Sequence, residues 1–233
     1  MASFFITGTD TGVGKTMVSG ALARRLSLSG RRVGVLKPVE TGCAAPHGSL
    51  VPADAVYLKE MAACPEEIEK ICPYRFSEPL APWVAATRVQ AAIDPEIIIA
   101  AFQDMAGRYD DVLVEGAGGL MVPLTGKVFM ADLVRALNIP LIIVARLGLG
   151  TINHTLLSVR QAIRCGIRVA GVVLNQLDPE IGIAEETNPQ VVAALSGVPL
   201  IGRLPFVPPQ QRRDAAFLAD LVGRYLDLSV FSL

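Results

Sequence analysis

A glycine-rich segment at residues 8–16, Gly-Thr-Asp-Thr-Gly-Val-Gly-Lys-Thr, constrains this chain more than any other feature. An apolar run at 4–6 precedes it and an amphipathic stretch follows it, which predicts a strand, a loop and a helix in that order. Glycines let backbone N–H groups approach phosphate oxygens, and the start of the helix adds its positive dipole end. Lys15 is then expected to reach the β- and γ-phosphates of a nucleotide, and Thr16 to give its hydroxyl to Mg²⁺. The first glycine and the glycine before Lys15 enclose five residues, one more than usual, so this is a lengthened phosphate-binding loop.

The composition predicts one folded enzyme domain over residues 1–233. With 52% hydrophobic and 18% charged residues, a chain of 233 residues can bury a core of its own. A net charge of −1, with scattered Lys and Arg residues, provides no basic field for nucleic acid. Phosphate binding is therefore expected to be local.

Cysteine usage and the length of the apolar runs predict a soluble protein of the cytoplasm. No Cys-x-x-Cys pair occurs and no signal peptide precedes the first predicted strand, which is typical of a reducing compartment. The most apolar runs, such as 141–145, end after a few residues and are far too short to span a membrane. We interpret the four cysteines as small buried hydrophobic residues: Cys43, Cys64, Cys72 and Cys165.

Short β-branched runs alternate with helical patterns, which predicts a doubly wound, mainly parallel α/β sheet with helices on both faces, of the P-loop nucleotide-binding type. The helix after the glycine loop is expected at 16–29, where apolar positions share one face. Segments 42–52 and 72–82 are rich in proline or glycine and are expected to be irregular loops that border a ligand. Strands are expected near 4–7, 33–37, 111–115, 141–145, 169–174 and 200–202.

Charged side chains stand where predicted strands end, and ligands of open parallel sheets bind beyond the carboxyl ends of the strands. Lys37 could neutralise part of a phosphate chain, although an ordinary solvated lysine fits its position equally well. Glu115 follows a buried run and precedes a glycine segment, which suits Mg²⁺ or a substrate amine. Asp54 fits either the same site or the first turn of a helix.

Several segments together resemble the dethiobiotin synthetase family. The resemblance implies a ligase of biotin biosynthesis that converts 7,8-diaminononanoate, CO₂ and MgATP into dethiobiotin, ADP and phosphate. It also implies a homodimer. The matching segments are 8–16, Lys-Pro-Val-Glu-Thr-Gly at 37–42, Glu-Gly-Ala-Gly-Gly at 115–119 followed by Val-Pro-Leu at 122–124, Leu-Gly-Thr-Ile-Asn-His at 149–154, and Asn175.

The resemblance also implies roles for individual residues. It makes Thr16, Asp54 and Glu115 ligands of Mg²⁺, and makes Lys15 and Lys37 the catalytic lysines that hold the transferring phosphoryl group. The nucleotide would lie on Gly12, Val13, Gly14, Lys15, Thr16, Met17, Asp54, Glu115, Gly116, Ala117 and Gly118, with its adenine at Asn175, Gln176, Pro205, Phe206 and Val207. The diamine or its carbamate would face Thr11, Lys37, Thr41, Gly118, Gly119 and, across the two-fold interface, Asn153.

Asn153 has two interpretations. Its amide could hold the distant carboxylate of a substrate bound by the neighbouring subunit. The alternative is an N-terminal cap of the helix that follows the strand at 141–145.

Three places depart from the family's pattern. Gly12 stands where members often carry an acidic residue, and Ala-Pro-Trp at 81–83 replaces a common Ser-Pro-His. An acidic nucleotide contact sometimes follows the 205–207 region, but this chain has Gln210, Gln211 and Arg212 there, so no such contact is assigned.

The reaction that the resemblance implies explains why fixed positive charge is needed. A carbamate formed on one amine attacks the γ-phosphate, and the second amine closes the ureido ring of the resulting mixed anhydride. Lys15, Lys37 and Mg²⁺ would stabilise the charge that develops on the phosphoryl oxygens, without a covalent protein intermediate.

A deviant P-loop ATPase switch is the main alternative function, because it shares the fold and could use a C-terminal helix as a membrane anchor. The polar side of that helix is acidic here, through Asp214, Asp220 and Asp227, whereas membranes favour lysine. Core packing is therefore expected of its apolar face, which consists of Leu218, Leu221, Val222, Tyr225 and Leu226.

Two further possibilities are disfavoured. A glutamine-dependent amide ligase of the cobyrinate type needs a second, glutaminase domain, for which 233 residues leave no room. A histidine metal site is not expected, because His47 and His154 are too few and too far apart in the sequence.

Overall fold

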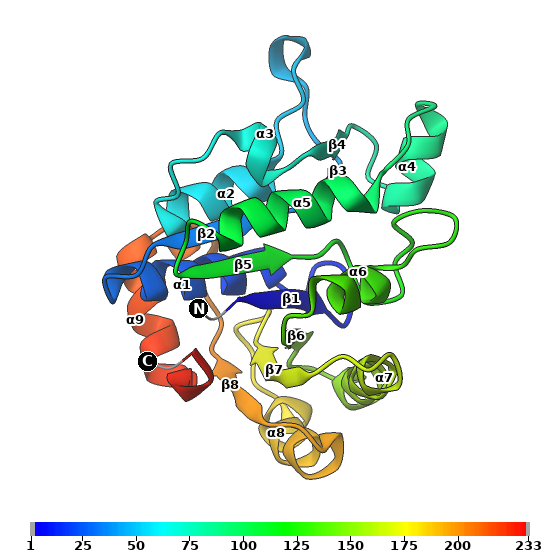
Figure 1. The fold of residues 1–233 in the computed structure, drawn as a ribbon. Helices are drawn as coiled ribbons and strands as arrows, with labels where there is room; N and C mark the ends of the chain where they lie inside the picture. Colours follow the sequence, from blue (N-terminus) through cyan, green and yellow to red (C-terminus); the bar gives the residue numbers. More distant parts are fainter. Residues whose placement is uncertain (1–2, 232–233) are drawn as a thin grey trace.

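The computed structural model describes residues 3–231, and its centre is a sheet of six parallel strands (Figure 1). These strands are β1 (Phe4–Gly8), β2 (Val33–Leu36), β5 (Asp111–Glu115), β6 (Leu141–Arg146), β7 (Val169–Asn175) and β8 (Leu200–Leu204). Their order across the sheet is β2-β5-β1-β6-β7-β8. The chain places β2 at one edge and then β5 between β2 and β1, and it afterwards reverses direction to add β6, β7 and β8 in turn on the other side of β1. Because crossovers between parallel strands are right-handed, this reversal puts helices on both faces of the sheet, which confirms the predicted fold class.

Helices cover the sheet. Helix α1 (Lys15–Leu28) packs against β1, β2 and β5, and α2 (Ala53–Ala62) packs on α1 and β2. Helix α5 (Pro95–Ala106) lies against β2 and β5, whereas α7 (Thr151–Arg164) lies against β6 and β7. The other helices are α3 (Ile68–Ile71), α4 (Pro82–Arg88), α6 (Met130–Leu137), α8 (Ile183–Ser196) and α9 (Ala215–Tyr225).

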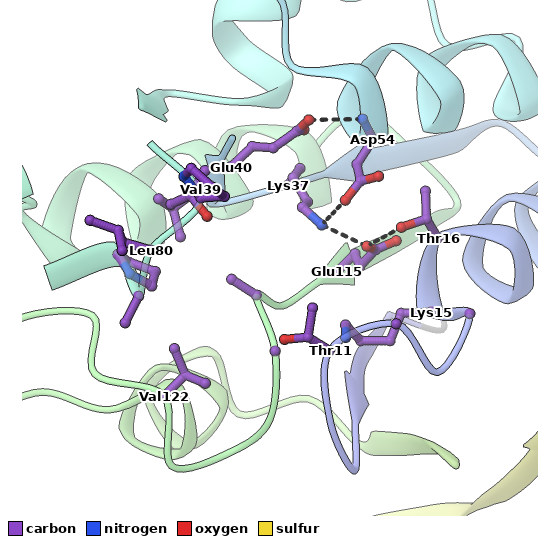
Figure 2. Close-up of a pocket in the computed structure, with 18 residues that line it drawn as sticks. Thr11, Lys15, Thr16, Lys37, Val39, Glu40, Asp54, Leu80, Glu115 and Val122 are labelled. Carbon is purple, nitrogen blue, oxygen red and sulfur yellow. Dashed lines mark hydrogen bonds and ion pairs between the residues drawn. The ribbon is translucent and has the colours of Figure 1, made fainter. Parts of the chain in front are cut away.

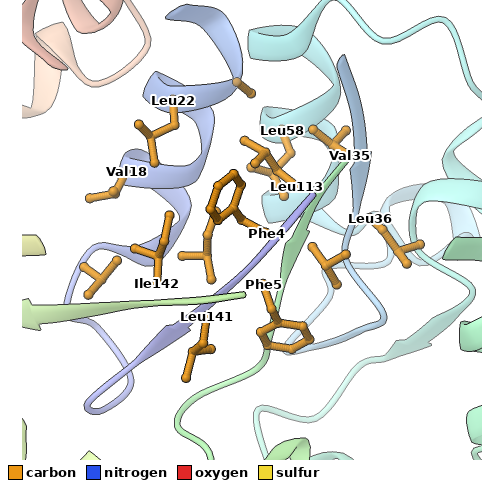
Figure 3. Close-up of a cluster of buried hydrophobic side chains, with 14 of the residues drawn as sticks. Phe4, Phe5, Val18, Leu22, Val35, Leu36, Leu58, Leu113, Leu141 and Ile142 are labelled. Carbon is orange, nitrogen blue, oxygen red and sulfur yellow. The ribbon is translucent and has the colours of Figure 1, made fainter. Parts of the chain in front are cut away.

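The apolar runs that predicted the strands form the core. Phe5 in β1 and Ile142 in β6 are fully buried, because the central strands are covered on both faces. Val18 and Leu22 of α1 are buried over the same strands (Figure 3). Burying a side chain of this size stabilises the fold by about 1.5–3 kcal/mol. This packing fixes the carboxyl ends of the strands, where the functional loops begin.

Two short strands that the sequence analysis missed form a second sheet. Strand β3 (Val39–Thr41) pairs in parallel with β4 (Tyr74–Phe76), so the expectation that 72–82 is irregular throughout was wrong. Strands of three residues show too little alternation to be recognised in sequence, and this pairing joins residues far apart in the chain.

The segment 42–52 is mainly a loop, as expected. An antiparallel bridge between Ala44 and Val51 closes it, and a short 3₁₀ turn at Pro46–Gly48 lies inside it. The side chain of His47, in that turn, lies outside the described part of the structure.

Helix α9 packs on α1 and on β8. Leu218 and Val222 are fully buried, which confirms the expected core packing of this helix. The sequence analysis placed Tyr225, the last residue of the helix, on the same apolar face, but 49% of it is exposed, so this part of the expectation was wrong. Between residues 3 and 231, no helix is both long and apolar enough to cross a membrane. That residues 1–233 form one domain stays a prediction.

Candidate active site

A cavity of about 560 Å³ opens where the loop after β1, the segment after β2 and the loop after β5 meet (Figure 2). These strands are neighbours in the sheet, so the loops at their carboxyl ends converge. The cavity is lined by Thr11, Gly12, Gly14, Lys15, Thr16, Lys37, Val39, Glu40, Thr41, Asp54, Pro79, Leu80, Ala81, Pro82, Glu115, Ala117, Gly118 and Val122. The structure thus brings together most of the residues that the sequence pointed to.

The glycine loop forms one wall of the cavity. Gly12 and Gly14 have φ angles of 77° and 90°, in the left-handed region that favours glycine. Gly14 ends the loop as the N-cap of α1, and the first residue of that helix is Lys15. The backbone N–H groups at the start of α1 are therefore available to an anion, as the motif predicts.

Lys15 lies folded over this loop. Its side chain is buried, and Nζ donates a hydrogen bond to the Asp10 carbonyl at 3.0 Å. A Cβ at Gly8 would lie 2.9 Å from this Nζ, so the first glycine of the motif leaves room for the lysine. Burial lowers the pKa of Lys15, an effect that the nearby Glu115 carboxylate opposes.

Lys37 stands at the centre of a charged cluster. Its Nζ lies 2.7 Å from Asp54 Oδ2 and 2.6 Å from Glu115 Oε1 (Figure 2). The Thr16 hydroxyl donates to the same Glu115 oxygen at 2.8 Å. Burial of Lys37 would lower its pKa, but the two carboxylates outweigh burial and hold the pKa above its usual range. Lys37 is therefore a buried, charged residue and not a solvated one.

The two carboxylates are placed for a cation. Glu115 is buried, and its Oε2 has no hydrogen-bond partner among the described residues. Burial raises the pKa of Asp54, but Lys37 reverses this and holds it below its usual value, so Asp54 stays ionised. The described side chains contain no group of three His, Cys, Asp or Glu that could hold a metal. Two carboxylates and the Thr16 hydroxyl, completed by phosphate oxygens, fit Mg²⁺, which usually needs only one or two carboxylates from a protein.

Glu40 is a residue of this cavity to which the sequence analysis gave no role. It lies in β3, is buried, and its two carboxylate oxygens accept hydrogen bonds from the backbone N–H groups of Asp54 and Ala55 at 2.9 and 3.0 Å. Burial raises the pKa of Glu40, and these two hydrogen bonds oppose the increase. Its partners lie 14 and 15 residues further along the chain, so no local motif could have indicated the contact.

Some residues of the segments 12–17 and 115–119, which were predicted to bind the nucleotide or the substrate, do not line this cavity. Val13 is buried, and Met17 packs on the core, so only their backbones can contribute to a nucleotide cradle. Gly116 is tied to β1, because its N–H donates to the Ile6 carbonyl. Gly119 lines a neighbouring cavity of about 530 Å³ instead.

Asn175 ends β7 beside the glycine loop. Its Nδ2 donates to the Val13 carbonyl at 3.0 Å, and its Oδ1 is buried without a partner in the described structure. A Cβ on Gly14 would lie 2.2 Å from Nδ2, so the glycine permits this approach. The Gln176 side chain points away from this contact, to Arg203 and the Asp178 carbonyl.

The segment 205–207 is held by Arg212. The Arg212 guanidinium lies 5.9 Å from the centre of the Phe206 ring, and its Nε donates to the Val207 carbonyl at 2.9 Å. The Arg212 carbonyl in turn accepts a hydrogen bond from the Tyr57 hydroxyl of α2 at 2.8 Å. Arg212, which stands where an acidic contact was sought in the sequence, thus stabilises this loop.

Asn153 lies in the first turn of α7 and is exposed. The N-cap of that helix is Gly150, so the interpretation of Asn153 as a helix cap was wrong. Asn153 also does not line the cavity of about 560 Å³, so within one chain it does not face the predicted substrate site.

The structure shows the neighbours of Gly12 and of residues 81–83, where the sequence departs from the family's pattern. A Cβ at Gly12 would meet no described atom within 4 Å, so the backbone angle and not space limits a side chain there. Ala81 and Pro82 line the cavity, whereas Trp83 turns outward, with 46% of it exposed, and packs beside Gly126.

Comparisons with known proteins identify the family of this chain. The family described as AAA domain matches residues 2–213. The chain is 42% identical over 214 residues to the ATP-dependent dethiobiotin synthetase BioD of Thermodesulfovibrio yellowstonii, over 88% of this chain and 89% of that protein. It is 43% identical over 223 residues to the protein of the same name from Anaeromyxobacter sp. (strain K), over 96% of this chain and 98% of that protein.

Solved structures show the same fold at low sequence identity. The septum site-determining protein MinD of Pyrococcus horikoshii, complexed with Mg-ADP, has a TM-score of 0.59 and 16% identity over 92% of this chain and 86% of its own. A ParA family ATPase from Chlorobium tepidum has a TM-score of 0.59 and 13% identity over 100% of this chain and 99% of its own. This likeness establishes the fold alone. The sequence identity to the named synthetases extends over most of both chains, and this chain therefore belongs to the family of ATP-dependent dethiobiotin synthetases, which are ligases of biotin biosynthesis.

Proposed function

We propose that this protein closes the ureido ring of dethiobiotin from 7,8-diaminononanoate and CO₂, using MgATP. The observation that carries the proposal is the cluster around Lys37, because one buried ammonium group joins Asp54 and Glu115 in the cavity that the glycine loop borders. A P-loop supplies the nucleotide site. The second lysine, Lys37, lines the same cavity and would face the acceptor of the phosphoryl group.

The lysines would act on the phosphoryl group. Lys15 would leave the Asp10 carbonyl for the β- and γ-phosphates, since a buried ammonium group gains more from an anion than from a neutral carbonyl. Lys37 would donate to the carbamate and to the transferring phosphoryl oxygens. Both charges are fixed before the reaction, so they stabilise the developing negative charge without reorganisation.

Mg²⁺ would be held by Thr16, Asp54 and Glu115, and it would neutralise phosphate charge when bound with ATP. The unpartnered Oε2 of Glu115 supports this assignment, because a buried carboxylate oxygen without a partner is costly unless a cation or donor satisfies it.

The adenine would lie between Asn175 and the 205–207 segment. The buried Oδ1 of Asn175 can accept a hydrogen bond from the exocyclic amine of adenine. The base would also contact Phe206, which Arg212 holds in place.

The diamine would occupy the other half of the cavity. Thr11, Thr41 and Gly118 line this cavity and would face its amines, as the family resemblance implies, whereas Gly119 lines the neighbouring cavity. Val39, Leu80 and Val122 line the same cavity and offer an apolar wall to an aliphatic chain.

We also propose a homodimer in the cytoplasm. Met121 and Leu157, both more than half exposed, line the neighbouring cavity of about 530 Å³ beside Gly119, where a second subunit could cover them. In such a dimer Asn153, on the same helix as Leu157, would reach the partner's substrate. Four free cysteines support a reducing compartment.

The release of ADP tests this function. A synthetase is expected to release ADP only when both 7,8-diaminononanoate and bicarbonate are present, and to form dethiobiotin in equal amount. ADP release that ignores both compounds would contradict the proposal and favour a switch ATPase of the MinD or ParA kind.

A further inference from the structure

One short segment of the chain, residues 37–40, holds both the side chain and the backbone of Asp54. Its carboxylate accepts a hydrogen bond from Lys37, and its backbone N–H donates to the carboxylate of Glu40 (Figure 2). Lys37 and Glu40 flank the Pro38–Val39 step, so the same segment contacts both the side chain and the backbone of Asp54. The Asp54 side chain itself is 43% exposed, and packing alone does not fix it.

The first turn of α2 lacks a cap of its own. Its N-cap is Pro52, which has no side chain that can accept a hydrogen bond. The N–H groups of Asp54 and Ala55 would otherwise be among the unsatisfied donors of a helix N-terminus. Both are satisfied by Glu40, one by each carboxylate oxygen.

Glu40 is in turn fixed by its surroundings. It is only 6% exposed and lies in the middle of β3, opposite Arg75 of β4. This second sheet thus provides the platform from which Glu40 reaches α2.

From this arrangement we propose that Glu40 is a positioning residue for Mg²⁺ binding: by capping α2 it fixes the Asp54 carboxylate beside Glu115 and Thr16. The inference rests on the proposed function, because it takes Asp54 as a ligand of the nucleotide-bound metal. Residues that orient a metal ligand in this way typically change metal affinity by about 10- to 100-fold when they are removed.

The experiment measures how much Mg²⁺ half-saturates the binding of a non-hydrolysable ATP analogue, by calorimetry on the full chain. Glu40→Ala and Asp54→Asn are each expected to raise this concentration about tenfold. The double variant is expected to match Asp54→Asn alone, because Glu40 acts through Asp54 and the two effects do not add. Glu60→Ala is the matched control, since Glu60 is an exposed acid on the same helix.

A second readout needs neither metal nor nucleotide. Hydrogen exchange of the Asp54 and Ala55 amides in the unliganded protein is expected to be at least about tenfold faster in Glu40→Ala than in the wild type or in Glu60→Ala, because these amides lose their acceptor. If Glu40→Ala does not fold, Glu40→Gln is used. It keeps one acceptor oxygen, so one of the two amides should exchange faster and the Mg²⁺ requirement should rise less.

The outcomes separate two failures. If Asp54→Asn raises the Mg²⁺ requirement and a folded Glu40 variant does not, or if their effects add, the role of Glu40 is overturned. If Asp54→Asn leaves the Mg²⁺ requirement unchanged, the metal site of the proposed function is overturned, and the role of Glu40 in it falls with that site.

Discussion

Lys37 illustrates how a single buried charge can be tolerated at a site. A lysine with a side chain only 4% exposed would lose its proton if it were alone, but two carboxylates within 2.7 Å keep it charged. A pair of this kind gives little net stability, because desolvation offsets most of the attraction. Removing one partner is costly, however, since it leaves the other charge buried and unpaired. Stability alone therefore does not account for the cluster, which agrees with the role in the reaction that we propose for it.

Substitution of Lys15 or Lys37 by glutamine should slow turnover by about 100- to 1,000-fold, because losing one fixed donor to a developing charge costs about 2.7–4 kcal/mol. Lys37→Gln should in addition lower the free energy of unfolding, by about 3–5 kcal/mol, since it leaves Glu115 buried without its partner. Turnover and urea unfolding are measured for both variants and for Lys127→Gln, a change at an exposed lysine. Wild-type turnover in Lys37→Gln would remove this residue from the mechanism.

Glu115→Gln should raise the Mg²⁺ concentration that half-saturates turnover, because the amide keeps the shape of the side chain and loses the charge. Nucleotide binding without metal should persist, since the glycine loop and Lys15 are unchanged. Titration of Mg²⁺ against turnover and metal-free calorimetry provide the two readouts. An unchanged half-saturation would show that the acid serves packing or Lys37 alone.

At the scale of elements, α2 links the two ends of the proposed nucleotide site. Asp54 in its first turn contacts Lys37, and Tyr57 one turn later reaches the Arg212 carbonyl beside the 205–207 segment. The Tyr57 ring packs on α1, where a Cβ on Gly20 would lie 2.4 Å from it. One helix thus ties the loop proposed for the base to the helix that carries the P-loop lysine.

Tyr57→Phe should weaken ATP binding by about 2- to 10-fold, because the lost hydrogen bond is worth about 0.5–1.5 kcal/mol and frees the loop that Arg212 anchors. The Mg²⁺ requirement should not change, since the first turn of α2 keeps its cap from Glu40. Tyr225→Phe, at an exposed tyrosine of α9, is the matched control. If calorimetry finds the same ATP affinity in Tyr57→Phe and wild type, the loop is not held through this hydroxyl.

At the scale of the whole molecule, Asn153 carries the proposal of a shared site. It lies on an exposed part of α7, outside the cavity that holds Lys15, Lys37 and Glu115. A substrate contact from Asn153 therefore requires a second copy of the chain. In the proposed dimer, exposed Leu157, one turn further along α7, would provide an apolar contact for that copy.

Subunit mixing tests this arrangement. Lys15→Gln chains and Asn153→Ala chains, each inactive alone, are mixed in equal amounts after dissociation. If each site combines Lys15 of one chain with Asn153 of the other, about half the dimers are mixed and each holds one intact site, so activity recovers to about a quarter of wild type. Mass spectrometry confirms that heterodimers form. No recovery in their presence would show that both residues act within one chain, or that Asn153 has no part in the site.

Much of this protein could be predicted from the sequence, because the signals are local. The inner strands of the main sheet, such as β1, β5 and β6, are apolar runs that are buried on both faces, and such runs are visible without knowledge of their partners. The glycine loop, Lys37 and Glu115 could be predicted as site candidates because each stands at the end of a predicted strand. The parallel order of the sheet then brings these three features to one edge.

The tertiary structure alone decided the contacts between distant segments. The pairing of β3 with β4, the cap that Glu40 provides for α2, and the hydrogen bond from Tyr57 to Arg212 join residues that no periodic pattern relates. The sequence left open whether Lys37 is solvated or buried, and whether Asp54 lies in the first turn of a helix only or also in the site. Both questions are decided by the folded structure, in which the Asp54 and Glu115 carboxylates face Lys37. The sequence shows which ionisable side chains follow each strand. Their pKa values depend on burial and on the distances between them, and both are set only when the loops come together in the folded protein.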